Sequence, residues 1–312
     1  MATARPKTAI LIVGPTAVGK TSAATELAKR FNTEIISADS RQCFKELNIG
    51  VARPSEHELQ TASHYFIASH SIHDNVSAGT FEQYALQKGN ELFQTHDRII
   101  VTGGTGLYVK AFCEGLDEIP NVPSNTREEI ISNYEKNGLE WLQKQVQQKD
   151  PRFYMSGEIQ NPHRLMRALE VAEATGRSIL EFRNGQKEAR DFNIVKIGLE
   201  LSKEELHRNI STRVDQMIDA GLVEEARELV PYKNLNALQT VGYIEIFEFL
   251  DGKISLEQAV ELIKQTTRQY AKRQMTWFKK DKEIKWFSPS QITQIETYLD
   301  SVIATDDTGF HR

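Results

Sequence analysis

The sequence predicts an α/β protein: a parallel sheet core, a helical insertion and a helical C-terminal region. Three observations carry this prediction. Short apolar runs alternate with helical patterns over the first hundred residues. A glycine-rich loop joins the first run to the first helix. About ninety residues then pass without a strand signal before the last such run, which indicates an insertion of helices.

The predicted strands are apolar runs of the buried type. Residues 9–13, 34–38, 98–102 and 195–201 fit this description, whereas residues 81–96 have the apolar spacing of a helix. Such runs, separated by helices, suit a parallel sheet that is covered on both faces.

The insertion is predicted to be helical throughout. Pro120 and Pro123 mark its entry, and a helix should begin near Arg127 and break into a hairpin at residues 137–138. A second helix is expected over residues 163–175.

The chain therefore divides into three expected segments. Residues 1–118 form the first part of the core, 119–192 the insertion, and 193–312 the last strand and the C-terminal helices. The helical part should extend to about Phe278, and the tail from Thr305 should be frayed.

Residues 14–21 carry the strongest chemical signal. They are Gly14, Pro15, Thr16, Ala17, Val18, Gly19, Lys20 and Thr21, which match G-x-x-x-x-G-K-[ST] between a strand and a helix. Backbone amides of this phosphate-binding loop (P-loop) cradle a di- or triphosphate, Lys20 would reach its terminal phosphates and Thr21 would bind Mg²⁺. The expected core is thus P-loop NTPase-like, although the loop alone cannot distinguish a nucleotide from another pyrophosphate.

Composition limits the possible location of the protein and its possible partners. The chain is 39% apolar and 26% charged, and it has no apolar segment near the ~20 residues of a membrane span. Residues 1–8 lack a signal-peptide core, so we expect a cytoplasmic protein. Its net charge of −5 gives no general attraction for nucleic acid, so such a partner would need a local basic face.

Two segments after strands can hold catalytic groups. Asp39 follows the second strand, where ligands of parallel sheets bind; it could accept a proton, hold a metal or simply cap a helix beside Ser40. Residues 103–106, Gly-Gly-Thr-Gly, end another strand without the carboxylate of a hydrolytic ATPase, and they offer the Thr105 hydroxyl.

Basic residues gather in two places. Eight Lys or Arg residues lie between Lys264 and Lys285, and Arg164 and Arg167 form a pair at helical spacing. A solvated helix is the plain alternative for the first group. Two basic helices in an acidic protein suggest that a second substrate is a polyanion.

Seven motifs in order resemble one family, the tRNA dimethylallyltransferases (tRNA isopentenyltransferases, or IPP transferases). They are the loop at 14–21, Asp-Ser-Arg-Gln at 39–42, Asn-Ile-Gly-Val-Ala-Arg-Pro at 48–54, Gly-Gly-Thr-Gly-Leu-Tyr at 103–108, Arg-Ala-Leu-Glu-Val at 167–171, Val-Gly-Tyr at 241–243 and the twelve residues 267–278. The chain departs from the family pattern at Arg41, Phe44 and Arg53, and at Ser63 and Tyr65 in the segment similar to P-H-H-L/F.

The resemblance implies transfer of a dimethylallyl group from dimethylallyl diphosphate to the 6-amino group of the adenosine 3′ of a tRNA anticodon. It implies a catalytic set of Asp39, Lys20, Thr21, Arg213 and Thr105, with Mg²⁺ held through Thr21. It further implies tRNA contacts by Asp39, Ser40, Arg41, Gln42, Thr105, Arg127, His163, Arg164, Leu165, Met166 and Arg167. We expect a monomer without an obligate protein partner.

Two other functions are compatible with the loop and Asp39. A small-molecule kinase would bind ATP at the same loop, but it should also have an arginine-rich lid, and no clear lid signature is present. A tRNA-binding protein without chemistry would not need Lys20, Thr21 and Asp39 together.

Overall fold

The computed structural model of the protein describes residues 7–306, so most of the tail expected to fray lies outside the described residues. The chain forms two compact units. One comprises the chain up to Cys113 and from Ala189 onward, and the other comprises Glu114–Glu188. The expected insertion, 119–192, is thus offset from the second unit by a few residues at each end.

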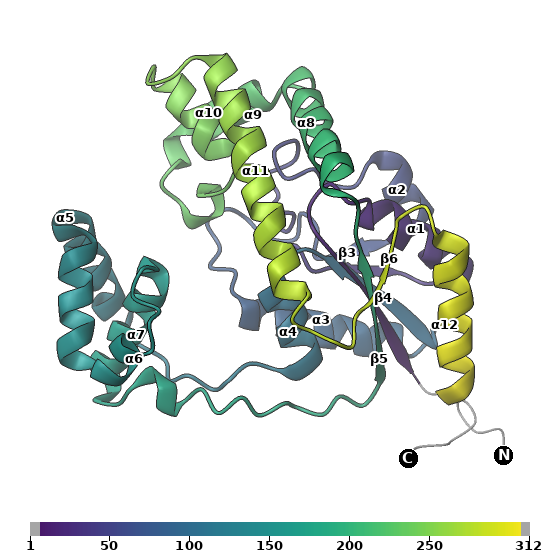
Figure 1. Ribbon diagram of the computed structural model, residues 1–312, viewed down its shortest axis with the longest axis horizontal. Helices are drawn as coiled ribbons and strands as arrows, with labels where there is room; N and C mark the ends of the chain where they lie inside the picture. Colours follow the sequence, from purple (N-terminus) through teal and green to yellow (C-terminus); the bar gives the residue numbers. More distant parts are fainter. Residues whose placement is uncertain (1–6, 307–312) are drawn as a thin grey trace. The chain divides into compact units, whose positions relative to one another are not determined.

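A parallel six-stranded sheet forms the centre of the first unit (Figure 1). Its order is β3-β2-β4-β1-β5-β6 and every strand pair is parallel. The strands are β1 (Thr8–Val13), β2 (Ile35–Ser37), β3 (His64–Tyr65), β4 (Arg98–Gly103), β5 (Asn193–Leu199) and β6 (Lys285–Phe287). The predicted α/β class is confirmed.

Alternating side chains of the strands bury against helices on both faces of this sheet. Ile10 and Ile12 pack in one apolar cluster with α1 (Lys20–Phe31) and α12 (Ile292–Asp306). Leu11 packs in the other cluster, to which several helices contribute. These are α3 (Ala78–Leu92), α4 (Gly106–Glu114), α8 (Lys203–Asp219), α9 (Leu222–Leu229), α10 (Tyr243–Leu250) and α11 (Leu256–Phe278).

The sequence prediction missed two strands. β3 and β6 are two and three residues long and only partly buried, so neither has an apolar run to reveal it. Consequently the strand expected near 195–201 is not the last one, because β6 pairs with it at the edge of the sheet. The remaining short elements are α2 (Glu56–Thr61), η2 (Val230–Tyr232) and η3 (Asn236–Leu238).

The second unit is helical. It contains α5 (Ser124–Lys149), α6 (Pro151–Met155), α7 (Pro162–Thr175) and η1 (Ile179–Glu181), packed around their own apolar core. The predicted break falls at Gly138, whose φ of 74° and ψ of −170° kink α5. Glycine adopts this positive φ without the steric cost that a Cβ atom would add.

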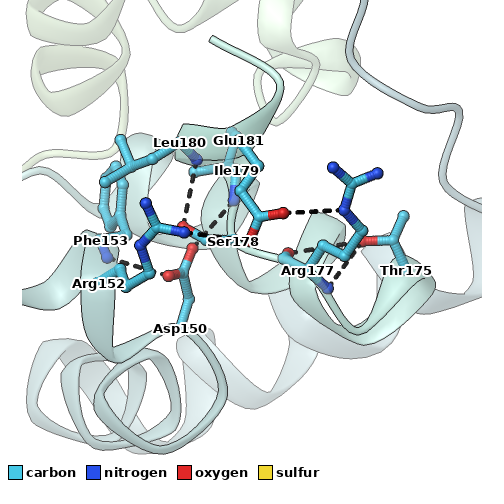
Figure 2. A network of polar contacts seen from close by, with 9 residues as sticks. All are labelled: Asp150, Arg152, Phe153, Thr175, Arg177, Ser178, Ile179, Leu180 and Glu181. Atoms are coloured by element: carbon cyan, nitrogen blue, oxygen red, sulfur yellow. Dashed lines mark hydrogen bonds and ion pairs between the residues drawn. The ribbon is translucent and has the colours of Figure 1, made fainter.

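A buried carboxylate connects two elements of this unit. Asp150 caps α6 by accepting a hydrogen bond from the amide of Phe153 at 3.0 Å, and its second oxygen accepts one from Ile179 at 3.1 Å. Figure 2 shows both bonds, together with Arg152 and Arg177, which pair with Glu181. One side chain therefore joins α6 to η1.

None of the helices over residues 7–306 is both long enough and apolar enough to cross a membrane.

Candidate active site

The carboxyl ends of three neighbouring strands converge on one pocket of about 260 Å³ in the first unit. β1 leads into the phosphate-binding loop, β2 into Asp39, and β4 into Gly103. This convergence follows from parallel pairing, which brings the same end of every strand to one edge of the sheet. The pocket is lined in part by Thr16, Gly19, Lys20, Thr21, Asp39, Gln42, His64, Arg213, Tyr270 and Gln274.

Glycine is required at both ends of the phosphate-binding loop. Gly14 and Gly19 have φ values of 147° and 98°, a region that other residues rarely adopt. A Cβ atom on Gly14 would also lie 2.5 Å from the carbonyl oxygen of Leu199 in β5. The loop therefore closes directly against the neighbouring strand, and Lys20 begins α1.

The side chain of Lys20 folds back onto the phosphate-binding loop. Its Nζ donates a hydrogen bond to the carbonyl oxygen of Pro15 at 2.8 Å. Burial lowers the pKa of Lys20 to about 7, attraction to Asp39 opposes this effect, and repulsion from Arg213 adds to it. An anion bound in the pocket would stabilise the charged form of this side chain.

Arg213 reaches the loop from α8. Its Nη1 donates to the Thr16 hydroxyl at 3.4 Å, and Asn209, one turn earlier, donates to the carbonyl oxygen of Ala17 at 3.3 Å. Lys20 and Arg213 thus bring two cationic groups to one pocket, as a diphosphate requires.

The donor set at Thr21 fits a magnesium ion. Over residues 7–306 there is no cluster of three His, Cys, Asp or Glu side chains that could hold a metal alone. Mg²⁺ does not need one, because it commonly keeps water and takes its other oxygens from substrate phosphates. The Thr21 hydroxyl and the Asp39 carboxylate line the same pocket and are both oxygen donors.

Asp39 performs a structural task with one oxygen only. Its Oδ1 accepts hydrogen bonds from the amides of Arg41 and Gln42 at 2.9 and 3.2 Å. Its Oδ2 has no hydrogen-bond partner among the residues that the structure describes, and the side chain lines the pocket. The capping and the catalytic interpretation of Asp39 are therefore compatible.

Two bridges hold the loops around Asp39. The Thr105 hydroxyl accepts from the amide of Ser40 at 3.1 Å and donates to its hydroxyl at 3.2 Å. Buried Gln274 accepts from the amide of Thr16 at 2.8 Å and donates to the carbonyl oxygen of Gly104 at 2.9 Å. Gln274 was not singled out in the sequence, because an amide inside a basic helix gives no signal of its own.

A second, more apolar cavity of about 370 Å³ adjoins the phosphate pocket. Six residues line both spaces: Thr16, Asp39, Val51, Ala52, Arg213 and Tyr270. Ile210, Val214, Met217, Val241, Ile244 and Ile263 supply apolar walls. Burial, together with the nearby Asp39 carboxylate, raises the pKa of Tyr270 to about 12, so its hydroxyl stays neutral.

Arg41 and Gln42 make contacts within the protein. Arg41 donates to the carbonyl oxygens of Asn236, Ala237 and Gln239, which connect α9 to α10. Gln42 donates to the carbonyl oxygen of Ala52 at 2.9 Å. Both side chains were expected to contact tRNA, and in this structure they fix loops of the first unit.

In the second unit, the arginines that were expected to contact tRNA form ion pairs with carboxylates. Buried Glu170 pairs with both Arg127 (3.6 Å) and Arg167 (3.0 Å), which come from α5 and α7, and Arg164 pairs with Glu158. His163 is exposed and Met166 half-buried.

The expectation that Leu165 contacts tRNA needs a correction. It is 0% exposed and lies in the apolar core of the second unit, so its side chain cannot contact an RNA. Position 165 faces inward because it belongs to the apolar stripe of α7, in which Leu165, Ala168, Leu169 and Ala172 recur at spacings of three and four residues.

His64 is a pocket residue that the sequence left unassigned. Its Nδ1 lies 2.9 Å from the carbonyl oxygen of Ala62, so Nδ1 carries the hydrogen and Nε2 is an acceptor. That Nε2 is buried, and no group within residues 7–306 forms a hydrogen bond with it. Burial lowers the pKa of His64, which keeps the ring neutral.

Fold and pocket together define an α/β protein with a phosphate-binding loop, in which Lys20 of the loop and Arg213 of α8 line one pocket together with the Asp39 carboxylate. A model of the IPP transferase family matches residues 42–281. The chain belongs to the IPP transferase family.

Individual relatives agree with this assignment. The chain is 48% identical over 295 residues to a tRNA dimethylallyltransferase of Cytophaga hutchinsonii, covering 95% of this chain and 97% of that protein. It is 50% identical over 297 residues to one of Christiangramia forsetii, covering 95% and 98%. The solved tRNA isopentenylpyrophosphate transferase of Bacillus halodurans has a TM-score of 0.71 at 31% identity, covering 97% and 98%.

Proposed function

We propose that this protein transfers the dimethylallyl group of dimethylallyl diphosphate to the 6-amino group of the adenosine 3′ of the anticodon in tRNA. The observation that carries the proposal is the shared boundary of two spaces. The phosphate pocket adjoins an apolar cavity, and Asp39 and Arg213 line both. The family, and relatives that are tRNA dimethylallyltransferases, support the same reaction.

The leaving group is the first chemical problem. The bond between the allylic carbon and the bridging oxygen breaks, and diphosphate leaves with the electron pair. Lys20, Arg213 and the loop amides are placed to stabilise that charge, which is most useful where it grows in the transition state. Mg²⁺ held at the Thr21 hydroxyl would neutralise further charge on the phosphate oxygens.

The acceptor is the second problem. An exocyclic adenine amine is a weak nucleophile, because its lone pair is conjugated with the ring. Oδ2 of Asp39 is available to accept a hydrogen bond from this amine and to take its proton as the new carbon–nitrogen bond forms. The base must leave the anticodon stack to reach the end of the sheet.

The dimethylallyl group needs an apolar surface beside the phosphates. Ile210, Val214 and Ile263 provide one in the adjoining cavity. The family assignment does not favour the alternative of a small-molecule kinase. Since tRNA is the proposed acceptor, we further propose a cytoplasmic enzyme, acting as a monomer.

One assay tests the reaction. Unmodified tRNA is incubated with dimethylallyl diphosphate labelled in its hydrocarbon, and in parallel with ATP labelled in its terminal phosphate. The proposal expects hydrocarbon label on the adenosine and none from ATP. Transfer of phosphate label to any acceptor, without hydrocarbon transfer, would establish a kinase instead. Removal of Mg²⁺ by a chelator should stop transfer, and added Mg²⁺ should restore it.

A further inference from the structure

One loop separates the phosphate pocket from the apolar cavity. We call residues 48–52, between β2 and α2, the wall loop. Val51 and Ala52 line both spaces, and Gly50 lines the apolar cavity. The loop has no regular secondary structure, and Ala52 has a φ of 47°, so other contacts must hold its shape.

On the side of the pocket, the wall loop is tied to the turn that carries Asp39. The side-chain amide of Gln42 donates to the carbonyl oxygens of Val51 and Ala52 at 3.3 and 2.9 Å. The backbone amide of Gln42 donates to Asp39. A shift of the wall loop would therefore also displace the turn that holds the Asp39 carboxylate.

On the other side, a single carboxylate holds three consecutive backbone amides. Glu225 of α9 accepts from Asn48 at 3.2 Å, from Ile49 at 2.8 Å and from Gly50 at 3.0 Å. It also accepts from the Tyr243 hydroxyl at 2.5 Å. An ionised carboxylate only accepts, so it can satisfy four donors at once, whereas an amide would turn N–H groups toward them.

Tyr243 completes the attachment. Its side chain is fully buried, and a Cβ atom on Gly50 would lie 2.6 Å from its ring, so the loop packs directly on the ring. Burial and the adjacent Glu225 carboxylate raise the pKa of Tyr243, so the hydroxyl remains a donor to that carboxylate.

We propose that Glu225 and Tyr243 are positioning residues that set the wall loop against the hydrocarbon of the donor, and so determine how tightly the prenyl part of the diphosphate is held. This inference rests on the proposed function. By the proposed function, Lys20, Arg213 and the loop at 14–21 hold the phosphates, and Glu225 hydrogen-bonds instead to the wall loop and Tyr243. Its effect should therefore depend on the hydrocarbon and not on the phosphates.

The test compares two ligands by calorimetry on the full chain: dimethylallyl diphosphate and inorganic diphosphate. Glu225→Gln should weaken binding of dimethylallyl diphosphate about tenfold, the scale of one lost hydrogen bond to a charged group. Binding of inorganic diphosphate should not change. Tyr243→Phe, which keeps the ring and three of the four bonds, should weaken dimethylallyl diphosphate about threefold.

Glu224→Gln is the matched control, since Glu224 is an exposed neighbour on the same helix, and it should bind both ligands as the wild type does. A purely structural role would lower the fraction of active protein, or weaken both ligands equally. Either result overturns the proposal, as does unchanged affinity for dimethylallyl diphosphate in Glu225→Gln and Tyr243→Phe. If Glu225→Gln does not fold, Tyr243→Phe decides alone.

Turnover by the wild type with tRNA, measured separately, reports on the proposed function. If the wild type binds dimethylallyl diphosphate more tightly than diphosphate but does not modify tRNA, the proposed function is wrong. The binding comparison between the variants can still be made in that case.

Discussion

The end of the sheet and the helical unit use charge in opposite ways. At the end of the sheet, the cations Lys20, Arg53 and Arg213 line a pocket with the carboxylates Asp39 and Glu58, and burial lowers the pKa of Lys20 to about 7. In the helical unit, Arg164 pairs with Glu158 at the surface, and the partly exposed Arg167 pairs with buried Glu170. Buried, under-neutralised charge suits chemistry on an anion, whereas arginines that reach the surface and are paired with acids suit reversible contact with a long polyanion.

The largest effect should come from Asp39. Asp39→Asn keeps an oxygen for the amides of Arg41 and Gln42 but removes the base, so turnover should fall roughly 10²–10⁴-fold. Affinity for dimethylallyl diphosphate should change little, and calorimetry on the same variant supplies that control. If donor binding collapses while the single-turnover rate survives, Asp39 acts on the metal or the phosphates.

Lys20 should come next. Lys20→Ala removes a charge contact to the leaving group, and turnover should fall at least ~100-fold at saturating dimethylallyl diphosphate. The affinity for tRNA should stay close to that of the wild type, because the second unit is unchanged. Near-normal turnover would remove Lys20 from the mechanism.

A smaller effect is expected from pH. The free protein holds Lys20 with a pKa of about 7, so its ammonium form is lost as pH rises through that value. Since the diphosphate needs the charged form, kcat/KM for dimethylallyl diphosphate should decline above about pH 7, by at most tenfold per unit.

Lys20→Arg separates this cause from others. Arginine keeps its charge over the whole range, so the variant, although slower, should lose the decline above pH 7. A decline that persists in Lys20→Arg assigns it to another group.

The smallest effect on chemistry should come from the helical unit. Replacing Arg164 and Arg167 with Ala should reduce the slope of log affinity for tRNA against log salt by ~0.7–0.9 per lost phosphate contact. Arg152 and Arg177, which pair with Glu181, offer a control of equal charge in the same unit. Equal slopes in wild type and the Arg164/Arg167 variant would make these arginines structural.

The sequence was sufficient where one short segment fixes its own geometry. The glycines, lysine and threonine of the loop at 14–21 predict phosphate binding, and the strands beside it have apolar runs. The sequence was insufficient where partners are distant along the chain. Nothing in α9 shows that Glu225 will hold the amides of residues 48–50, because that contact exists only after α9 packs beside the loop.

Arg41 and Gln42 illustrate the same limit within a matched motif. Their contact with tRNA stays a prediction, and a residue type does not reveal whether its donors face a ligand or a neighbouring carbonyl group. Leu165 was placed among the tRNA contacts because the family resemblance covers the whole segment 163–167, although helical periodicity turns its side chain into the core.

The division between the two regions is tested most directly by single-turnover rates at saturating tRNA and dimethylallyl diphosphate. The account predicts that the Arg164→Ala/Arg167→Ala variant transfers the dimethylallyl group at the wild-type rate once tRNA is saturating, while Asp39→Asn is slower by at least ~100-fold. A double arginine variant that is as slow as Asp39→Asn under these conditions would contradict it, because the helical unit would then take part in the chemical step.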